Sequence, residues 1–322
     1  MLSAPTQCWI LSDGSAGMEV QAVGLARAMG LHAIVKPVKP SGLLRALPWL
    51  ARFPGVPAVA SETLEPPYPT IAITCGRRHA GASIALRRLS AGKTYTIHIQ
   101  DPRVSPSLFD TLIVPDHDPP RGPNVITTTG SLNRISDDHL RREAAIFAAQ
   151  VAPLPKPRIA VNLGGDTRQY KIDKARADNI VEDLRSLLNS QRCGLMVTTS
   201  RRTGKPLMDA LAMLANRADT LLWTGDGPNP YMGFLGLTDA IIVTSDSINM
   251  VSEACSTGKP VHIIRMGNEP IRRAKFLEAV QQQDLARAFE GKVEFWSPTP
   301  LRETERVAER LVVQLKSAGI LG

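Results

Sequence analysis

Short apolar runs alternate along the chain with longer stretches in which apolar residues recur every three or four positions. In the first half this pattern predicts helices near 17–30, 79–91 and 137–150, and strands over 8–12, 32–38, 70–75, 94–100, 109–115 and 124–129. Strands that alternate with amphipathic helices are typical of parallel sheets with helices on both faces. We therefore expect an α/β domain in this half.

The same alternation begins again after the proline-rich stretch VAPLPKPR at 151–158, which interrupts regular structure. The strands predicted beyond it are residues 158–163, 194–200, 220–224, 240–245 and 260–266. The last segment, from Pro300 to about Ser317, has an apolar stripe and predicts a helix with Pro300 in its first turn.

Two doubly wound, Rossmann-like domains that face each other across a cleft are the simplest architecture for this pattern. We place these domains at 1–152 and 153–298, and we expect a helix within 299–322 to cross back to the first domain. A chain of 322 residues suits two domains of roughly 150 residues each. Its 43% hydrophobic and 21% charged residues agree with a folded protein.

The cysteines and the N-terminus indicate where the protein works. Four cysteines lie far apart with no metal-ligand spacing, so we expect reduced core thiols at Cys8, Cys75, Cys193 and Cys255. The N-terminus has no basic start, Asp13 interrupts its apolar stretch, and no apolar run approaches about 20 residues. We expect a cytoplasmic protein without a membrane span, and we leave open peripheral attachment to the inner membrane.

The net charge of +8 is spread evenly along the chain. Residues 1–150 hold 15 Lys and Arg against 11 Asp and Glu, and residues 151–322 hold 23 against 19. Nucleic-acid-binding proteins concentrate their basic residues on one element, so we expect no nucleic acid partner. Phosphate-bearing small molecules or anionic lipid heads fit this distribution better.

The sharpest chemical signal is TSDSINMVSEACSTGKP, which directly follows the predicted strand 240–245. A helix that begins here would present free N–H groups and its positive dipole end where doubly wound sheets bind ligands, which suits a pyrophosphate. The nucleotide-binding residues predicted at this helix start are Ser245, Asp246, Ser247, Asn249 and Met250. Glu253, one turn further on, could accept both ribose hydroxyls, and an ordinary capped helix is the alternative.

Two more loops follow predicted strands of the second half. In VNLGGDTRQY the paired Gly164 and Gly165 would let the backbone approach a ligand, and Arg168 could meet a phosphate. In TTSRRTGKP we predict that Arg201 faces the same ligand, with Arg202 and Lys205 beside it. The chain lacks the glycine patterns of dinucleotide-binding and P-loop proteins, so we expect no cofactor.

The first half offers three candidates for a catalytic base, each in a loop after a predicted strand. Asp13 lies in LSDGSAG, His79 in TCGRRHAG and Asp101 in IQDPR. A carboxylate or imidazole at these positions could take the proton of an acceptor hydroxyl, whereas Asp13 could also simply cap the following helix. The pattern alone leaves all three open.

The stretch GLLRALPWLARFPGVPAV at 42–59 mixes Leu, Trp49 and Phe53 with Arg45 and Arg52. Such a segment could rest on a bilayer, with its aromatic rings at the interface and its arginines on anionic heads. Core packing at a domain edge explains the pattern about as well.

These motifs resemble those of the elongated-mitochondria family, which comprises a plant mitochondrial fission factor and bacterial relatives with a GT-B glycosyltransferase-like fold. The resemblance spans nearly the whole chain and rests on the strings WILSDGSAG with Gln21, TCGRR, VNLGGDTRQY, GPNPYMGFLGLTDAIIVTSDSINMVSEACSTGKPVHII, FEG and PLRETERVA. Val20 departs from the family, in which Asn is common at this position.

The second half also looks like the peptidoglycan N-acetylglucosaminyltransferase that uses a lipid-linked acceptor, where a glutamate holds the donor ribose. By this resemblance Glu253 takes that role. The family implies nucleotide-sugar binding more firmly than turnover. Our first interpretation is a metal-independent glycosyltransferase that moves a sugar from a nucleotide sugar to an envelope or lipid-linked acceptor at the membrane surface. A nucleotide-sugar 2-epimerase and a non-catalytic adaptor, as in the plant member, are the alternatives, because a fold alone does not fix a function.

Overall fold

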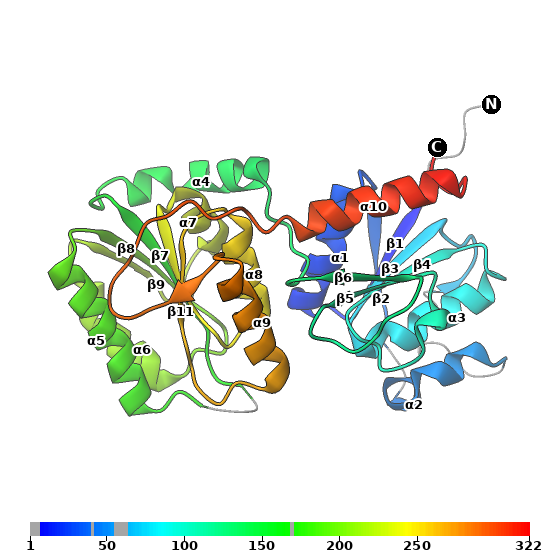
Figure 1. Ribbon diagram of the computed structural model, residues 1–322, viewed down its shortest axis with the longest axis horizontal. Coiled ribbons are helices and arrows are strands. Elements are labelled where there is room, and N and C mark those ends of the chain that lie inside the picture. The colour runs from blue at the N-terminus through cyan, green and yellow to red at the C-terminus, as the bar shows by residue number, and fades with distance from the viewer. Residues whose placement is uncertain (1–6, 40–41, 55–63, 168–170) are drawn as a thin grey trace. The chain divides into compact units, whose positions relative to one another are not determined.

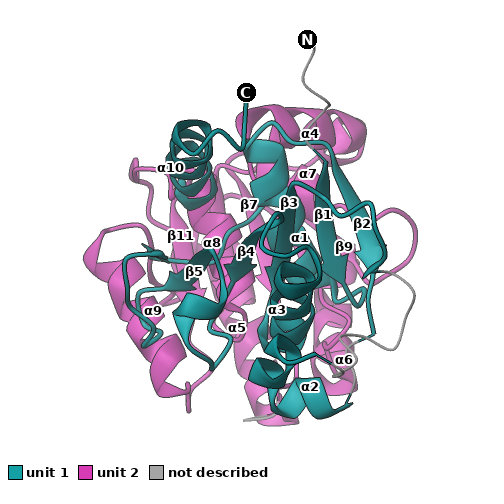
Figure 2. Ribbon diagram, turned by 90° about the vertical axis from the view of Figure 1, so that its right-hand side faces the viewer, with its two compact units in different colours: residues 1–134, 302–322 teal, residues 135–301 magenta. Residues whose placement is uncertain are grey.

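The computed structural model describes residues 7–39, 42–54, 64–167 and 171–322, which form two compact units. Unit 1 comprises residues 1–134 and 302–322, and unit 2 comprises residues 135–301 (Figure 2). Each unit contains a six-stranded parallel sheet with helices on both faces (Figure 1). The predicted fold class, two doubly wound α/β domains, is confirmed.

The sheet of unit 1 has the strand order β2-β1-β3-β4-β5-β6. Its strands are β1 (Cys8–Ser12), β2 (Ala33–Pro37), β3 (Ile71–Cys75), β4 (Tyr95–Ile99), β5 (Thr111–Pro115) and β6 (Val125–Thr128). Its helices are α1 (Ala16–Ala28), α2 (Gly42–Ala46), α3 (Ala80–Leu89) and α10 (Glu303–Ser317), with the short 3-10 turns η1 (Pro48–Arg52), η3 (Arg77–His79) and η4 (Pro106–Leu108).

Alternate residues of the buried strands β1 and β3 belong to two separate cores in unit 1. Ile10 and Ile73 point to the face that α1 and α10 cover, and Leu11 and Ala72 point to the face that α3 covers. Successive strand residues point to opposite faces, so strands that are apolar throughout supply both cores. Helix α10 enters the first core through a stripe of buried residues, Val307, Ala308, Leu311 and Leu315.

The sheet of unit 2 has the strand order β12-β11-β10-β7-β8-β9. Its strands are β7 (Arg158–Leu163), β8 (Gly194–Thr199), β9 (Thr220–Trp223), β10 (Ala240–Thr244), β11 (Val261–Ile264) and β12 (Arg287–Ala288). Its helices are α4 (Asp137–Val151), α5 (Lys174–Ser190), α6 (Lys205–Ala215), α7 (Tyr231–Leu237), α8 (Ile248–Ser256) and α9 (Ile271–Gln282). Helices α5 and α6 pack on one face, and α4, α7, α8 and α9 share the core of the other.

The boundary between the units lies near residue 134, not at the proline-rich stretch near residue 152. Helix α4 belongs to unit 2 because it packs closely on α7. A Cβ atom on Gly233 would lie 2.4 Å from Phe147, and one on Gly236 would lie 2.6 Å from the carbonyl of Leu140. Only glycines allow this approach, and sequence periodicity does not reveal it.

Helix α10 begins at Glu303, so the prediction that Pro300 lies in its first turn is wrong. The Pro300 ring instead lies over Gly258, where an added Cβ atom would be 2.7 Å from the proline Cγ. Gly258 has a φ of +70° after helix α8, a backbone conformation that favours glycine. Leu301, next to this proline, still packs in the core of unit 2.

The four cysteines are free and buried, as predicted. Burial raises the pKa of Cys8 to about 12 and that of Cys193 to about 11, the latter also through the charge of Asp219. These thiols therefore stay protonated. Among the described residues, every helix is too short or too polar to span a bilayer.

Candidate functional site

Each sheet has one point at which the chain reverses its direction of winding. In unit 2 this switch point lies between β7 and β10, and in unit 1 between β1 and β3. Ligands of doubly wound folds bind at the carboxyl ends of the strands beside such a point. Asp13, His79, Gly164, Gly165 and the residues from Ser245 to Glu253 follow these strands, whereas Asp101 follows β4 and Arg201 follows β8.

A cavity of about 540 Å³ opens at the carboxyl ends of the unit 2 strands, entirely within that unit. Its lining residues are Leu163, Thr198, Thr199, Ser200, Arg201, Trp223, Thr224, Gly225, Asn229, Tyr231, Met250 and Glu253. Three of the predicted nucleotide-binding residues, Arg201, Met250 and Glu253, therefore share one cavity. Its mixture of apolar walls and a few polar groups is typical of small-molecule sites.

Glu253 is the acidic group of this cavity and is only 8% exposed. It lies in the second turn of α8, and the phenol of Tyr231 donates a hydrogen bond of 2.7 Å to its Oε2. Tyr231 begins α7, so two successive helices, which β10 separates in the sequence, hold the carboxylate in place. A buried carboxylate is costly unless it accepts hydrogen bonds, and a ligand with hydroxyl groups can supply more of them.

The glycines after β7 have a structural role that the sequence did not reveal. A Cβ atom on Gly164 would lie 2.0 Å from a carboxylate oxygen of Asp246, and one on Gly165 would lie 2.0 Å from the carbonyl oxygen of Arg202. These glycines therefore let three loops pack tightly at the carboxyl edge of the sheet. Both glycines are buried and are not among the lining residues of the cavity.

Asp246 connects these three loops. One of its oxygens accepts the hydroxyl of Thr244 at 2.7 Å. The other accepts the N–H of Gly165 at 3.3 Å and the guanidinium of Arg202 at 2.8 Å. The side chain of Asp246 is completely buried, so its charge is balanced within the protein. Arg202 is thereby paired with Asp246, whereas the neighbouring, exposed Arg201 lines the cavity.

Ser245, Ser247 and Asn249 are the remaining residues predicted to bind a nucleotide at the start of α8. The buried hydroxyl of Ser245 donates to Glu269 at 2.8 Å and accepts the N–H of Met266 at 2.9 Å. Ser247 is the N-cap of α8 and accepts the N–H of Met250. Asn249 is half-buried in the first turn. Ser247 therefore fixes the helix start, and Ser245 connects this loop to the one after β11. The contact of these three residues with a nucleotide stays a prediction, and Arg168 lies outside the described residues.

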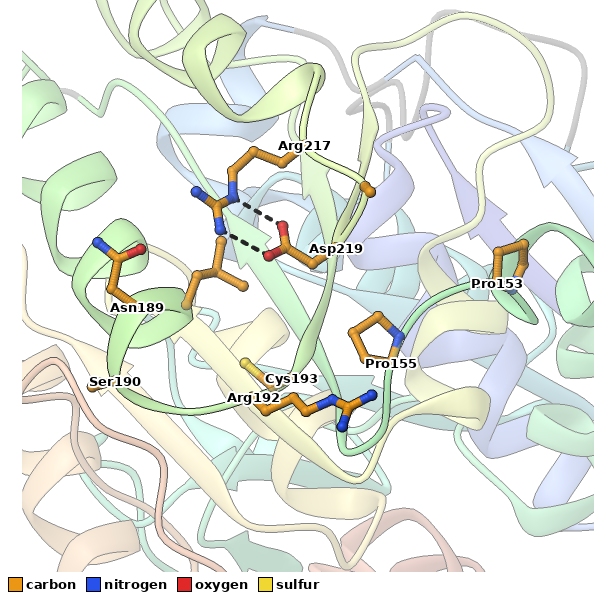
Figure 3. A pocket seen from close by; sticks show the side chains of 10 residues that line it. Pro153, Pro155, Asn189, Ser190, Arg192, Cys193, Arg217 and Asp219 are labelled. Carbon is orange, nitrogen blue, oxygen red and sulfur yellow. Dashed lines mark hydrogen bonds and ion pairs between the residues drawn. The ribbon is translucent and has the colours of Figure 1, made fainter.

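A second cavity of about 650 Å³ lies at the opposite, amino-terminal edge of the same sheet (Figure 3). It borders the starts of β8 and β9, at Cys193 and Asp219. Arg217 in its wall makes two hydrogen bonds to Asp219, of 2.9 and 2.8 Å. Because these opposite charges pair with each other, and because the cavity lies at the wrong edge for a doubly wound ligand site, the first cavity is the stronger candidate.

At the switch point of unit 1 the structure brings Asp13 and His79 together. Nε2 of His79 lies 3.5 Å from Oδ1 of Asp13, and its Nδ1 lies 2.8 Å from the carbonyl oxygen of Cys75. A carbonyl only accepts, so Nδ1 carries a proton and Nε2 faces the carboxylate. The side chain of Asp13 is 20% exposed and that of His79 is buried, so the carboxylate is the outer member of this pair.

The charge of Asp13 is maintained by its neighbours. Burial raises its pKa, but the hydrogen bond from Ser15 and the charges of His79 and Arg78 together outweigh this effect and lower the pKa below its usual value. The guanidinium of Arg78 lies 3.7 Å away. Asp13 is therefore ionised at neutral pH. It also accepts the N–H of Ser15 at 3.1 Å, so it belongs to the turn that leads into α1.

A third ionisable side chain, His98, lies within the sheet of unit 1. It is fully buried on β4, its Nδ1 lies 2.8 Å from the hydroxyl of Thr74, and its ring stacks on Phe109 with centroids 4.7 Å apart. Burial, together with the charge of His79, lowers the pKa of His98 to about 3. His98 is therefore neutral at physiological pH, and sequence reasoning did not identify it.

Asp101 lies at the end of β4, next to β3, and is half-buried. Its Oδ1 accepts the N–H of Arg103 at 2.8 Å in a turn where Arg103 has a φ of +56°. Asp101 therefore stabilises this turn. The contact between Asp13 and His79 makes that pair the stronger candidate for proton transfer.

Two cavity residues that the sequence analysis did not assign are Tyr231 and Trp223. Trp223 ends β9, so the rule that ligands bind after parallel strands could have identified it. Tyr231 lies in the string GPNPYMGF that carries the resemblance, but no local pattern connects it to Glu253. That contact arises only from the packing of α7 and α8.

The chain is similar to known proteins over nearly its whole length. The family model described as Mitochondrial fission ELM1 matches residues 16–315. The chain is 28% identical to the mitochondrial fission protein ELM1 of Arabidopsis thaliana, over 96% of this chain and 91% of that protein.

Solved structures of GT-B glycosyltransferases and UDP-GlcNAc 2-epimerases are also similar. The UDP-GlcNAc 2-epimerase of Methanocaldococcus jannaschii, solved in complex with UDP-GlcNAc and UDP, aligns with a TM-score of 0.52 and 13% identity, covering 95% of this chain and 99% of that one. MurG of Acinetobacter baumannii aligns with a TM-score of 0.50 and 12% identity, over 98% and 92%. At this identity the likeness shows the fold alone.

Proposed function

We propose that this chain, which belongs to the mitochondrial fission ELM1 family, binds a nucleoside diphosphate sugar in unit 2 and transfers the sugar to an acceptor bound at unit 1. The observation that carries this proposal is the buried carboxylate of Glu253 in the 540 Å³ cavity. A ribose can donate two hydroxyl hydrogen bonds to it, and the apolar wall formed by Leu163 and Met250 offers a surface for the base.

The same cavity suits a diphosphate as well. The exposed guanidinium of Arg201 lines it, and helix α8, which carries Met250 and Glu253, directs the positive end of its dipole toward the carboxyl edge of the sheet. When the sugar leaves, negative charge grows on the diphosphate oxygen, and fixed positive groups stabilise that charge most effectively in a site that excludes water.

Unit 1 supplies the acceptor side in this proposal. The acceptor hydroxyl oxygen forms a bond to the anomeric carbon while the bond from that carbon to the diphosphate breaks, and Asp13 takes the hydroxyl proton. His79, 3.5 Å from Asp13, stabilises the ionised carboxylate before this transfer. An envelope glycan or a lipid-linked sugar is the acceptor class we propose. No cofactor enters this reaction, since the nucleotide sugar is the donor substrate.

Calorimetric titration with UDP and UDP-GlcNAc, followed by GDP, ADP and CDP, tests the binding step. We expect Glu253→Ala to lower the affinity of the best ligand by at least tenfold, and by about a hundredfold or more if both ribose bonds are lost, because each hydrogen bond to a carboxylate contributes ~1.5–3 kcal/mol. Glu278→Ala is the matched control, since Glu278 is an exposed glutamate on helix α9 of the same unit. Equal affinities of both folded variants would make Glu253 a structural residue and favour an adaptor.

The products then distinguish the two enzyme reactions. A glycosyltransferase releases the nucleoside diphosphate only with an acceptor, whereas a 2-epimerase converts the nucleotide sugar without one. Proton NMR of UDP-GlcNAc incubated with the protein alone therefore separates them. If a second epimer of the nucleotide sugar appears with the wild type and not with Glu253→Ala, the reaction is epimerisation and not transfer.

A further inference from the structure

Helix α2 lies beside α3 in unit 1 (Figure 2), and the 3-10 turn η1 packs on α3. The other side of α2 and η1 carries exposed apolar side chains. Leu44, Pro48 and Ala51 are buried against the unit. The outward side chains are Leu43, Leu47, Trp49 and Phe53, which are 54%, 42%, 38% and 42% exposed. Together with the exposed Arg45 and Arg52 they form what we name the α2–η1 surface.

Arginines are interleaved with these apolar groups. The guanidinium of Arg52 lies 5.5 Å from the ring centre of Trp49 and 4.6 Å from that of Phe53. Two arginines of neighbouring elements reach the same segment: Arg77 donates to the carbonyl of Ala46 at 3.5 Å, and Arg88 donates to that of Phe53. Within the described residues, no carboxylate forms an ion pair with Arg45 or with any of these three.

The sequence around this surface is unusually poor in acidic and polar groups. Between Glu19 and Glu62 the chain has no Asp or Glu, whereas it has five Lys and Arg. Residues 42–54 also contain no Ser, Thr, Asn or Gln. A specific protein interface carries about one hydrogen bond per 100–200 Å². Here only the arginines and the indole N–H of Trp49 offer side-chain donors, and no side chain offers an acceptor, so the surface suits a fluid, negatively charged partner better than a folded one.

We propose that the α2–η1 surface binds the face of an anionic lipid bilayer. Its leucines and aromatic rings would enter the boundary between head groups and acyl chains, and its arginines would contact lipid phosphates. Neither contact needs a defined partner geometry. The Arg52 guanidinium already lies over two rings, an arrangement that keeps its charge beside apolar surface at a membrane interface.

This surface is continuous with the candidate acceptor site. Helix α2 contacts η3, the turn that ends in His79, and Arg77 of this turn donates to α2. A bilayer on the surface would therefore lie beside the switch point of unit 1. The inference that the acceptor is lipid-linked rests on the proposed function, whereas bilayer binding itself does not.

Vesicle flotation of the full-length chain tests the proposal. We expect co-flotation with vesicles of phosphatidylglycerol and phosphatidylethanolamine, at least fivefold more than with phosphatidylcholine, and weaker binding in high salt. Arg45→Glu with Arg52→Glu, and separately Trp49→Ser with Phe53→Ser, should each lower partitioning at least about tenfold. The control pair, Arg310→Glu with Val313→Ser, alters exposed residues of α10 and should bind like the wild type.

The proposal would be overturned if both surface variants co-floated with the vesicles as well as the wild type does. It would also be overturned if the wild type co-floated with none of the vesicle preparations. A second measurement uses Trp49→Phe, which keeps the aromatic ring. Brominated lipid should quench wild-type fluorescence more than that of this variant if Trp49 enters the bilayer, and equal fractional quenching would contradict it. Nucleotide titration without vesicles is independent of both measurements, so failure of lipid binding and failure of the proposed function are distinguishable.

Discussion

At the switch point of unit 2 the Asp246 carboxylate is completely buried, whereas at that of unit 1 the Asp13 carboxylate is 20% exposed. Asp246 accepts a hydroxyl, a backbone N–H and a guanidinium from three segments of the chain. Asp13 contacts its own turn, Arg78 and His79, all at 3.1 Å or more. The same topology thus holds one carboxylate as part of the structure and presents the other to solvent.

This difference matches the two tasks that we propose. A binding cavity gains affinity when its loops are fixed before the ligand arrives, because less ordering remains to be done on binding. A proton acceptor, in contrast, must be accessible to the group that it deprotonates. We therefore expect substitutions at the unit 2 switch point to alter stability, and those at the unit 1 switch point to alter reactivity.

The largest expected effect is that of Gly165→Ala. An added Cβ atom would overlap the backbone carbonyl of Arg202, so two loops must separate, and we expect a loss of about 3 kcal/mol. In thermal unfolding this corresponds to a midpoint lowered by about 6–12 °C. Gly204→Ala is the control, because its nearest neighbour atom would be 3.6 Å away. Similar midpoints for the two variants would show that the loops of unit 2 are not fixed by this packing.

Next in size is the contrast between Asp246→Asn and Asp13→Asn. An amide at position 246 would direct its N–H groups at another donor, and we expect the free energy of unfolding to fall by about 2 kcal/mol. The fall is no larger because the Arg202 side chain is 45% exposed, so solvent screens its attraction to Asp246. At position 13 we expect less than about 1 kcal/mol, because Arg78 is 47% exposed and 3.7 Å away.

Urea unfolding of both variants measures this contrast, and transfer activity gives the complementary result. Asp13→Asn should stay folded and lose sugar transfer while it keeps nucleotide affinity. If it instead destabilised the protein as much as Asp246→Asn, the assignment of a structural role to one carboxylate and a reactive role to the other would be wrong.

The strands were predictable because their signal is local. The bounds of β1 (Cys8–Ser12) and β7 (Arg158–Leu163) agree with the predicted ones, since each is a buried apolar run that ends at a polar or glycine residue. The unit boundary was not predictable, because the contact of Gly233 with Phe147 joins segments far apart in sequence.

The candidate site divides in the same way. Loops after strands identified Asp13, His79 and Glu253, since strand ends are visible in the sequence. The sequence did not reveal that His79 lies beside Asp13 or that Tyr231 hydrogen-bonds to Glu253. It also did not reveal that both carboxylate oxygens of Asp246 accept hydrogen bonds from neighbouring segments. Each of these depends on which strands and helices become neighbours. Periodicity alone does not specify this.

His98 gives the region beneath the unit 1 switch point a pH dependence. The folded-state pKa is about 3 against 6.5 for an ordinary histidine. Between these values the unfolded chain binds a proton that the folded chain does not, so stability falls as the pH drops from 6.5 toward 3 and rises as the pH returns. The contribution is at most about 1.4 kcal/mol per pH unit and is absent above pH 6.5.

Unfolding free energies measured from pH 7.5 to 5 for wild type and His98→Asn isolate this contribution. The variant should be less stable at pH 7.5, because it loses the stacking on Phe109, but its stability should fall less steeply below pH 6.5. The control is His32→Asn, which alters an exposed histidine of the same unit and should keep the wild-type slope. Parallel curves for wild type and His98→Asn would mean that His98 can be protonated in the folded protein.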